Sequence, residues 1–384
     1  MQEPIPSSET ATPLRVCHLI PGISGTAKHW SRLEQALERS KLYDQIYIHD
    51  SSVSQKGYNP NHFRTLGELF LDNIEAVKQR GGSLDVLATS LATTDLEGVF
   101  KVIERETHDP NFFAKPENAQ ALRLILISPW GFVESISEAF SSIQRFGGLL
   151  KEMGTKGGDE MGIMSLQLVK PKEVNESMLA DALTETYPER VQKIEDQPEV
   201  STLDISELER QSEDYFKRLK SKDQTDLQKV DLLIQDAVTE KNWSELKKLL
   251  RQRGIVLYPY IWNVLQGKEI DDAEPVDFSK SMRLGGQLGI SFLKRAPAII
   301  QSTLLGKPYQ RLLELMRAGA SVNFLIPEFD QIVPARDIED FINLSLVQGK
   351  KDKESRALNL KSTTHVSSYS MNQVALVNAL RQLY

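Results

Sequence analysis

The stretch that decides the fold is Leu84-Asp85-Val86-Leu87-Ala88-Thr89-Ser90-Leu91-Ala92. It begins as a short apolar run typical of a buried strand, and an amphipathic helical pattern follows over 92–106. A serine between strand and helix, with small residues two positions before and after it, indicates a sharp turn whose helix N-terminus points N–H dipoles at the hydroxyl. Ser90 is therefore a candidate nucleophile, and the simpler alternative is that it only caps the helix.

Short apolar runs alternate with longer amphipathic segments on both sides of this stretch. That alternation is typical of a parallel sheet with crossover helices, so we predict an α/β fold with a mostly parallel sheet flanked by helices. In such a sheet, loops converge at the carboxyl ends of the strands, which is where ligands bind. The predicted strands are 14–20, 45–49, 84–88, 122–128, 322–326 and 357–360, and the predicted helices include 63–78, 92–106, 335–346 and 371–383.

The alternation stops over residues 133–307, where mainly helical patterns occur, among them a hairpin over 227–250. We predict a core of 14–132 and 308–384, a helical cap or lid inserted over 133–307, and a short disordered lead over 1–13. Because the insertion leaves the sheet at its carboxyl edge, it is expected to roof the site. Its apolar, glycine-interrupted segment 282–305 suits either a mobile lid or ordinary packing on the core. Its charged segment 184–226 is expected to be a solvated helix and loop.

Two further residues complete a candidate constellation with Ser90. Asp330 follows the strand predicted over 322–326, and His365 lies in the loop between the last strand and the last helix. A hydroxyl, a carboxylate and an imidazole are the groups of a nucleophile, an orienting acid and a general base. Asp330 has the alternative role of a turn residue, in which case Glu328 or Glu134 would supply the acid.

The chain order Ser, Asp, His at successive strand ends resembles that of the α/β-hydrolase superfamily. The resemblance covers about 14–132 and 308–384, and the insertion occupies the position of that family's cap. Its motifs, besides the serine turn, are Pro21-Gly22-Ile23-Ser24-Gly25 with Trp30, Leu126-Ile127-Ser128-Pro129-Trp130-Gly131, and Phe324-Leu325-Ile326-Pro327-Glu328-Phe329-Asp330-Gln331-Ile332-Val333-Pro334.

The resemblance implies a serine hydrolase acting on a small-molecule carboxylic ester, thioester or related acyl substrate through an acyl-serine intermediate. Ser90 would be the nucleophile, His365 the base and Asp330 the group that orients the imidazole. The backbone N–H groups of Ile23 and Leu91 would form the oxyanion hole. The sequence departs from the family at Ala88 and Ala92, where glycine is usual, at Pro21, where histidine is common, and at Thr364, where glycine is frequent. These departures favour an alternative, a catalytically silent member that binds a ligand or a protein partner, and acyl transfer to an acceptor other than water is a third possibility.

Charge and composition argue against several further classes of protein. The net charge of -7 gives no attraction for phosphate backbones, so we expect no nucleic-acid partner. The single cysteine, Cys17, excludes an intramolecular disulfide, and no apolar run is long enough to span a membrane. The first residues have no secretory pattern, so we expect a soluble, cytoplasmic protein.

No cofactor or metal ion is expected either. The sequence has no His-Glu-x-x-His, no Cys-x-x-Cys and no acidic calcium loop. The segment from Gly22 to Lys28 is a poor phosphate-binding loop, because Ala27 precedes the lysine and His29 follows it. No predicted strand is followed by the glycine pattern of a dinucleotide-binding loop.

Overall fold

The structure is a computed structural model, and it describes most of the chain. The described residues are 12–22, 27–51, 53–54, 57–58, 61–90, 92–130, 141, 144–145, 147–148, 158–200, 206–273, 307–347, 356–367, 371 and 373–384. Most of the predicted lead and the whole of the predicted lid segment 282–305 therefore lie outside the described residues.

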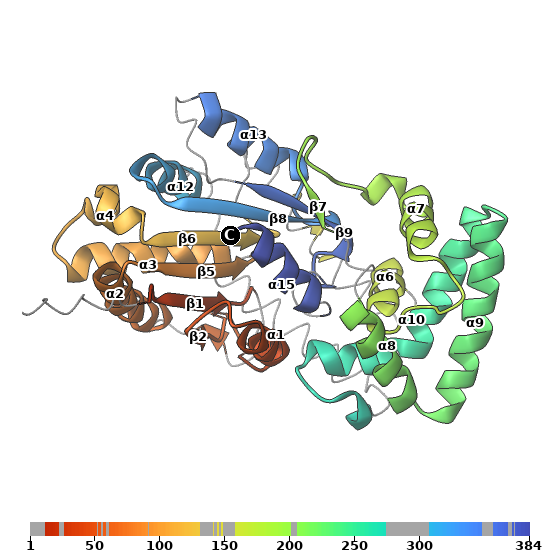
Figure 1. The fold of residues 1–384 in the computed structure, drawn as a ribbon. Coiled ribbons are helices and arrows are strands. Elements are labelled where there is room, and N and C mark those ends of the chain that lie inside the picture. The colour runs from red at the N-terminus through yellow and green to blue at the C-terminus, as the bar shows by residue number, and fades with distance from the viewer. Residues whose placement is uncertain are drawn as a thin grey trace, which may run out of the picture.

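A parallel sheet forms the centre of the molecule (Figure 1). Its seven strands have the order β2-β1-β5-β6-β8-β9-β7, and every neighbouring pair is parallel. The predicted class, α/β with a mostly parallel sheet flanked by helices, is confirmed. The strands are β1 (Arg15–Ile20), β2 (Gln45–Ile48), β5 (Ser83–Thr89), β6 (Leu122–Ile127), β7 (Glu199–Val200), β8 (Ser321–Phe329) and β9 (Ala357–Thr364), and a separate hairpin pairs β3 (Val53–Ser54) with β4 (Gly57–Tyr58).

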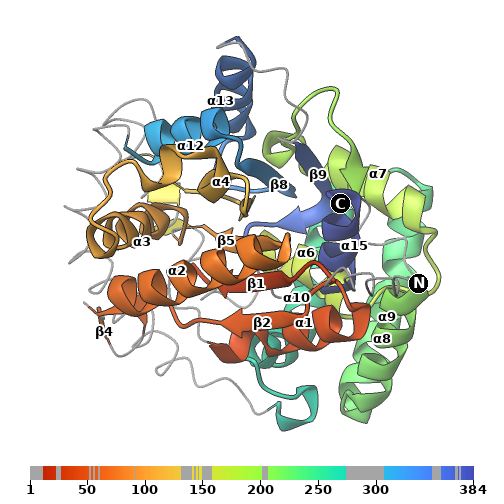
Figure 2. The same cartoon turned by 60° about the vertical axis from the view of Figure 1, so that its left-hand side comes forward.

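Helices cover both faces of this sheet (Figure 2), which explains why the strand sequences are almost continuously apolar. In β1, Val16 and Ile20 belong to the apolar cluster on one face, whereas Cys17 and Leu19 belong to the cluster on the other. The first face carries α2 (His62–Arg80), α3 (Ala92–Glu106), α4 (Pro116–Ala119), α12 (Lys307–Ala318), α13 (Ala335–Val347) and the short 3-10 helix η1 (Phe112–Ala114), and the second carries α1 (Ala27–Ser40) and α15 (Gln373–Gln382).

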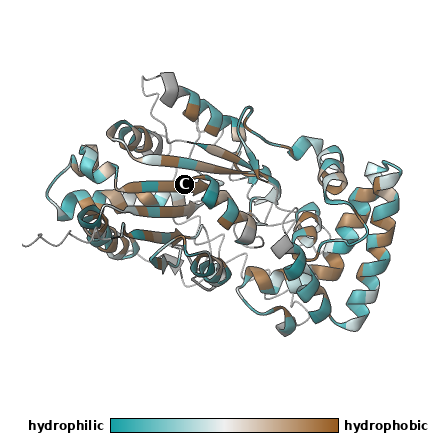
Figure 3. Cartoon of the chain, in the orientation of Figure 1, coloured by the Kyte–Doolittle hydropathy of each residue, from teal (hydrophilic) through white to brown (hydrophobic). Residues whose placement is uncertain are grey.

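The described residues between β6 and α12 lie, mostly as helices, beyond the carboxyl ends of the strands (Figure 1). Their buried apolar side chains form two clusters, one of which includes Phe329 at the end of β8, and the ribbon of α9 carries both hydrophilic and hydrophobic residues (Figure 3). The predicted hairpin is present and is longer than predicted. The described elements here are α6 (Asp159–Leu168), α7 (Glu176–Thr186), α8 (Ser206–Arg218), α9 (Ser221–Thr239), α10 (Trp243–Leu265) and the 3-10 helices η2 (Pro188–Arg190) and η3 (Ile270–Asp272).

The end of the sheet differs from the expectation in three ways. Strand β8 continues through Pro327 and Glu328 to Phe329, beyond its predicted end at Ile326, and β9 runs on to Thr364, beyond its predicted end at Leu360. The inserted region is not entirely helical, because its two residues of β7 pair with Asn359 and Leu360 and cover the outer edge of β9. These additions rest on pairing between distant segments, which a local apolar pattern does not reveal.

A bulge in β9 accompanies these extra residues. Pro327 pairs with Leu360 and Phe329 pairs with Thr364, so two residues of β8 face four residues of β9. Ser362, inside the bulge, has a φ of 57°, in the left-handed region that residues other than glycine seldom adopt. A bulge bends a strand and redirects the side chains that follow it. His365 comes directly after the strand that is bent in this way.

Candidate active site

Ser90 occupies the turn between β5 and α3. Its φ of 51° is left-handed, which gives the sharp change of direction that the sequence predicts. The Ser90 N–H donates to the carbonyl of Ile127 at 3.0 Å, and the Ser90 carbonyl accepts from the N–H of Trp130 at 3.1 Å. Backbone bonds to β6 and the residues after it therefore hold the turn in place.

Gly22, at the end of β1, packs directly against this turn. Its N–H donates to the Thr89 hydroxyl at 2.8 Å. A Cβ atom at position 22 would lie 2.9 Å from the Cβ of Ser90 and 3.0 Å from the carbonyl oxygen of Thr89. Only glycine allows so close an approach of the two chains. The two predicted oxyanion-hole residues, Ile23 and Leu91, lie outside the described residues.

The alanines that replace the family's glycines do not prevent the turn. Ala88 and Ala92 are both buried, and Ser90 between them has the left-handed conformation. Their methyl groups belong to the apolar cluster that packs β5 against α2 and α3. The substitutions therefore do not abolish the backbone geometry of the turn.

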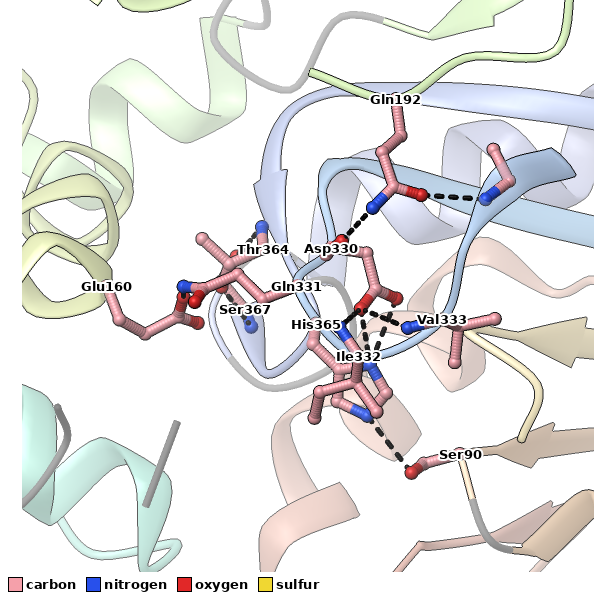
Figure 4. A network of polar contacts seen from close by, with 11 residues as sticks. Ser90, Glu160, Gln192, Asp330, Gln331, Ile332, Val333, Thr364, His365 and Ser367 are labelled. Atoms are coloured by element: carbon pink, nitrogen blue, oxygen red, sulfur yellow. Dashed lines mark hydrogen bonds and ion pairs between the residues drawn. The ribbon is translucent and has the colours of Figure 1, made fainter. Parts of the chain in front are cut away.

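Asp330 follows β8 and is 1% exposed. Its Oδ1 accepts hydrogen bonds from the N–H of Ile332 at 2.8 Å and from that of Val333 at 3.1 Å. Its backbone carbonyl accepts a hydrogen bond from the Gln192 side chain (Figure 4). Asp330 is thus also a turn residue, which was the alternative considered for it, and the same carboxylate serves both purposes because it has two oxygens.

His365 joins Asp330 to Ser90 (Figure 4). Its Nδ1 lies 3.0 Å from each carboxylate oxygen of Asp330, and its Nε2 lies 3.0 Å from the Ser90 hydroxyl oxygen. When Nδ1 carries the proton and its N–H donates a hydrogen bond to the carboxylate, the lone pair of Nε2 faces the hydroxyl. The structure therefore brings together the three predicted side chains, each of them buried.

Glu328, the alternative acid, has a different set of contacts. Its carboxylate accepts from the N–H of Ser362 at 2.7 Å and from the Thr184 hydroxyl at 3.4 Å. Burial raises the pKa of the Glu328 carboxyl above its ordinary value, and the Ser362 N–H opposes that rise. Glu328 thus accepts the hydrogen bond of a backbone N–H in the bulge of β9. The other alternative acid, Glu134, lies outside the described residues.

Thr364 stands where the family frequently has glycine, and it forms hydrogen bonds across the loop that carries His365. Its N–H donates to the Ser367 hydroxyl at 2.8 Å, and the Ser367 N–H donates to the Thr364 hydroxyl at 3.2 Å. This reciprocal pair has the spacing of a helix capping box, Thr-x-x-Ser, and that spacing was the available sequence signal. Sequence reasoning assigned no role to Thr89, Ser367 or Gln192, whose partners are distant or backbone groups.

A second group of imidazoles lies away from Ser90. His18 Nδ1 and His49 Nε2 share a hydrogen bond of 2.9 Å, and Asn73 Nδ2 lies 2.9 Å from His18 Nε2. Burial lowers the pKa of His18 well below its ordinary value, and the neighbouring His49 lowers it further. Burial also raises the pKa of the Cys17 thiol, which disfavours a reactive thiolate there.

Across the described part of the chain, three or more His, Cys, Asp or Glu side chains nowhere gather in an arrangement that would hold a metal ion. Among the helices described, none has the length and apolarity to cross a membrane.

The chain was compared with known proteins. No protein-family model and no curated protein matches it. Solved structures that it resembles include a lipase from Acinetobacter baumannii described as putative (13% identity, 98% of this chain and 84% of that one, TM-score 0.38). The chain is also similar to a structure from a study of carboxylesterases of Nitrososphaera gargenis, with 9% identity over 96% of this chain and 90% of that one and a TM-score of 0.40. It is similar too to the peroxisomal α/β-hydrolase Lpx1 of Saccharomyces cerevisiae, with 10% identity over 98% of this chain and 78% of that one and a TM-score of 0.37.

These identities are low, so the topology of the chain itself carries the assignment. A serine on a sharp turn after a central parallel strand is followed in chain order by an aspartate and a histidine at later strand ends, as the resemblance to the α/β-hydrolases implied. The chain has the α/β-hydrolase fold.

Proposed function

We propose that the protein is a serine hydrolase that acts on a carboxylic ester, thioester or related acyl substrate through an acyl-serine intermediate. The observation that carries the proposal is the pair of contacts made by His365, 3.0 Å to the Ser90 hydroxyl on one side and 3.0 Å to the Asp330 carboxylate on the other. A nucleophile hydrogen-bonded to a base that is itself oriented by a third group is the signature of acyl transfer.

In the first half of the reaction, the Ser90 oxygen attacks the acyl carbon while its proton passes to His365 Nε2. The carbonyl electron pair moves to oxygen and then returns, and the bond from the acyl carbon to the leaving alcohol or thiol breaks. His365 gives its proton to that leaving group. Asp330 stabilises the imidazolium that exists between the two proton transfers.

In the second half, water takes the place of the leaving group. His365 removes a proton from the water, the hydroxide oxygen bonds to the acyl carbon, and the bond to Ser90 breaks as the serine recovers its proton. The products are a carboxylic acid and the free enzyme. Acyl transfer would follow the same course with another hydroxyl, thiol or amine in the place of water.

The N–H groups of Ile23 and Leu91 are proposed to stabilise the oxyanion. Each such donor contributes about 3 kcal/mol of transition-state stabilisation. The proposal is supported by Gly22, which precedes Ile23 and packs against Ser90. Leu91 directly follows the nucleophile, where the turn exposes backbone N–H groups.

The inserted residues 133–307 are proposed to be a cap that selects the substrate, separate from a core of 14–132 and 308–384. Phe329, at the carboxyl end of β8, packs among buried residues of α6, α7, α9 and α10. Gln331, next to Asp330, donates to the Glu160 carboxylate of α6 at 3.3 Å. The inserted helices therefore lie beside the candidate acid, where a cap would control access.

Labelling with a fluorophosphonate probe tests the hydrolase proposal. We expect wild-type protein to be labelled covalently and Ser90→Ala to lose labelling entirely, because the probe reacts only with an activated hydroxyl. Ser128→Ala is the matched control. Ser128 also follows a strand of the sheet, has a φ of 48° and is buried. A folded wild-type protein that is not labelled would favour a silent, ligand-binding member of the superfamily.

Matched esters and thioesters of graded acyl length then define the substrate class. Release of the alcohol or thiol, measured with wild type and with Ser90→Ala, separates enzymatic from spontaneous hydrolysis. Labelling without turnover, followed by turnover when an alcohol or amine acceptor is added, would change the assignment to acyltransferase.

A further inference from the structure

Residues 191–200 of the inserted region run from η2 into β7 and form what we call the strap. The strap belongs to the charged segment for which a solvated helix and loop were expected. Instead, Ile194 and Val200 are buried, and Gln192 is half-buried beside the loop that carries Asp330. Part of this segment therefore packs on the sheet rather than in solvent.

Gln192 makes three hydrogen bonds to the segment from Glu328 to Ala335. Its backbone N–H donates to the Glu328 carbonyl at 2.7 Å. Its side-chain Nε2 donates to the Asp330 carbonyl, and its Oε1 accepts from the Ala335 N–H at 2.7 Å (Figure 4). One side chain thus joins both ends of the acid loop, residues 330–335.

Each of these contacts satisfies a group that the loop itself leaves open. Ala335 is the first residue of α13, and the first N–H groups of a helix have no partner within the helix. Within the loop, the N–H groups of Ile332 and Val333 donate to the Asp330 carboxylate, which also contacts His365, and not to the Asp330 carbonyl. That carbonyl accepts its hydrogen bond from a donor outside the loop. Gln192 supplies that donor and an acceptor together.

The strap is also fixed to β9, the strand that leads to the proposed base His365. The Asn359 side chain of β9 accepts from the Ile194 N–H at 3.0 Å and donates to the Ile194 carbonyl at 2.9 Å. Farther along, Glu199 and Val200 pair with β9 as strand β7. The strap therefore joins the acid loop after β8 to the strand that leads to His365.

We infer that Gln192 is a positioning residue, which holds the Asp330 carboxylate against His365 by bracing the acid loop from the inserted region. This role rests on the proposed hydrolase function. The hydrogen bonds of Gln192 go to Glu328, Asp330 and Ala335, so it acts through Asp330. A displacement of about 1 Å at a reacting group costs up to about 100-fold in rate, which makes the brace consequential.

The test compares Gln192→Leu with Gln197→Leu. Gln197 is a matched control because it lies in the same strap, is also half-buried, and uses its Oε1 to accept from the Ala357 N–H at 3.4 Å, at the amino end of β9. We expect the fluorophosphonate labelling rate to fall at least tenfold in Gln192→Leu and less than twofold in Gln197→Leu. Gln192→Glu keeps the acceptor for Ala335, but it loses the donor to Asp330 and places a negative charge against the Asp330 carbonyl. Its labelling rate should also fall at least tenfold, and it serves if the leucine variant does not fold.

A second measurement does not depend on catalysis. In protein with labelled histidines, the Nδ1 proton of His365 is expected at low field because it is hydrogen-bonded to a carboxylate, and its loss in His365→Gln identifies it. We expect Gln192→Leu to broaden this signal or move it upfield and Gln197→Leu to leave it unchanged, at temperatures well below unfolding.

The two measurements together separate the possible failures. If wild type is not labelled but the His365 signal depends on Gln192, the positioning role stands and the hydrolase proposal fails. If wild type is labelled and Gln192→Leu retains both the signal and the labelling rate, the positioning role is wrong. Equal losses in the leucine variants at 192 and 197 would also overturn it, because the effect would then belong to the whole strap.

Discussion

The two sides of the candidate site are supported by different parts of the chain. The Ser90 turn is held by Gly22, Thr89, Ile127 and Trp130, all within the first part of the sheet. The Asp330 and His365 loops depend on side chains of the inserted region as well. These are Gln192 at the acid loop, and Thr184 and Gln167 at the Glu328–Ser362 contact in the bulge of β9.

The contacts of the Ser90 turn thus come from residues on or just after β1, β5 and β6, whereas those of the Asp330 loop and of the β9 bulge also come from residues between β6 and α12. The inserted region then has two effects on the proposed reaction. It is proposed to limit access to Ser90, and its side chains also contact the loop of Asp330 and the bulge that precedes His365. Mutations on the two sides should therefore differ in what they change.

The largest effect is expected at the nucleophile side, from Gly22→Ala. The new methyl group would meet Ser90 and the Thr89 carbonyl at 2.9 and 3.0 Å, so backbone must move. We expect a loss of stability of about 1–3 kcal/mol from overpacking. The fluorophosphonate labelling rate should also fall about 100-fold because the nucleophile is displaced. Urea unfolding and labelling kinetics measure the two effects.

Gly148→Ala is the control for this substitution, since an added Cβ there meets no atom within 4 Å. If Gly22→Ala labels as fast as wild type, the close approach of β1 to the turn does not support the nucleophile, and the contrast between the two sides loses half of its basis.

The next effect is expected from acid, and in free energy of unfolding it is comparable to that of Gly22→Ala. Burial and, to a lesser extent, the nearby His62 lower the pKa of His49 from 6.5 to about 4, and Asp50 opposes the shift. Below pH 6.5, His49 therefore binds a proton in the unfolded chain, whereas in the folded chain it stays mostly neutral down to about pH 4. The free energy of unfolding therefore falls as the pH falls. We expect a loss of about 3 kcal/mol between pH 7 and pH 4 from this residue, which urea unfolding across that range would measure.

Hydrogen exchange locates this loss. Protection in β1 and α2, which carry His18 and Asn73, and in β2, which His49 directly follows, should fall at pH 5 before protection in β8 and β9 does. His49→Gln removes the titrating group and should flatten the pH dependence. A steep acid transition that persists unchanged in this variant would assign the loss to other groups.

The smallest effect is expected on the acid and base side, at Glu328. Truncation in Glu328→Ala leaves the buried N–H of Ser362 without its acceptor, which costs about 1–2 kcal/mol. Glu328→Gln retains an acceptor and removes a carboxyl whose burial raises its pKa, so its stability at pH 7 should stay within about 0.5 kcal/mol of wild type. Thermal unfolding of the two variants tests the difference, and equal losses would show that charge, not the hydrogen bond, is what matters.

Sequence reasoning was most successful where structure depends on neighbours in the chain. The helix predicted over 92–106 has those bounds, and the strand predicted over 84–88 is one residue shorter at each end than β5. Apolar periodicity and the residues that stop it are local signals. The predicted fold class and superfamily followed from the order of such elements.

Reasoning from the sequence failed where distant segments meet. The predicted strand ended at Ile326, yet Pro327 and Glu328 continue β8, because the bulge of β9 accommodates the irregular pairing at this point. The charged segment 184–226 suggested solvated structure, yet the strap within it packs beside Asp330. A glutamine that bonds only to backbone groups far along the chain leaves no periodic signal.

The sequence by itself determined which side chains stand at the strand ends and in what order, because strands, turns and caps arise from residues close together in the chain. Only the tertiary structure decided that a hydroxyl and an imidazole 275 positions apart lie 3.0 Å from each other. The same holds for the β9 bulge and the Gln192 brace. Such distances depend on how the sheet twists and on what packs against its ends, and these are properties of the whole folded chain.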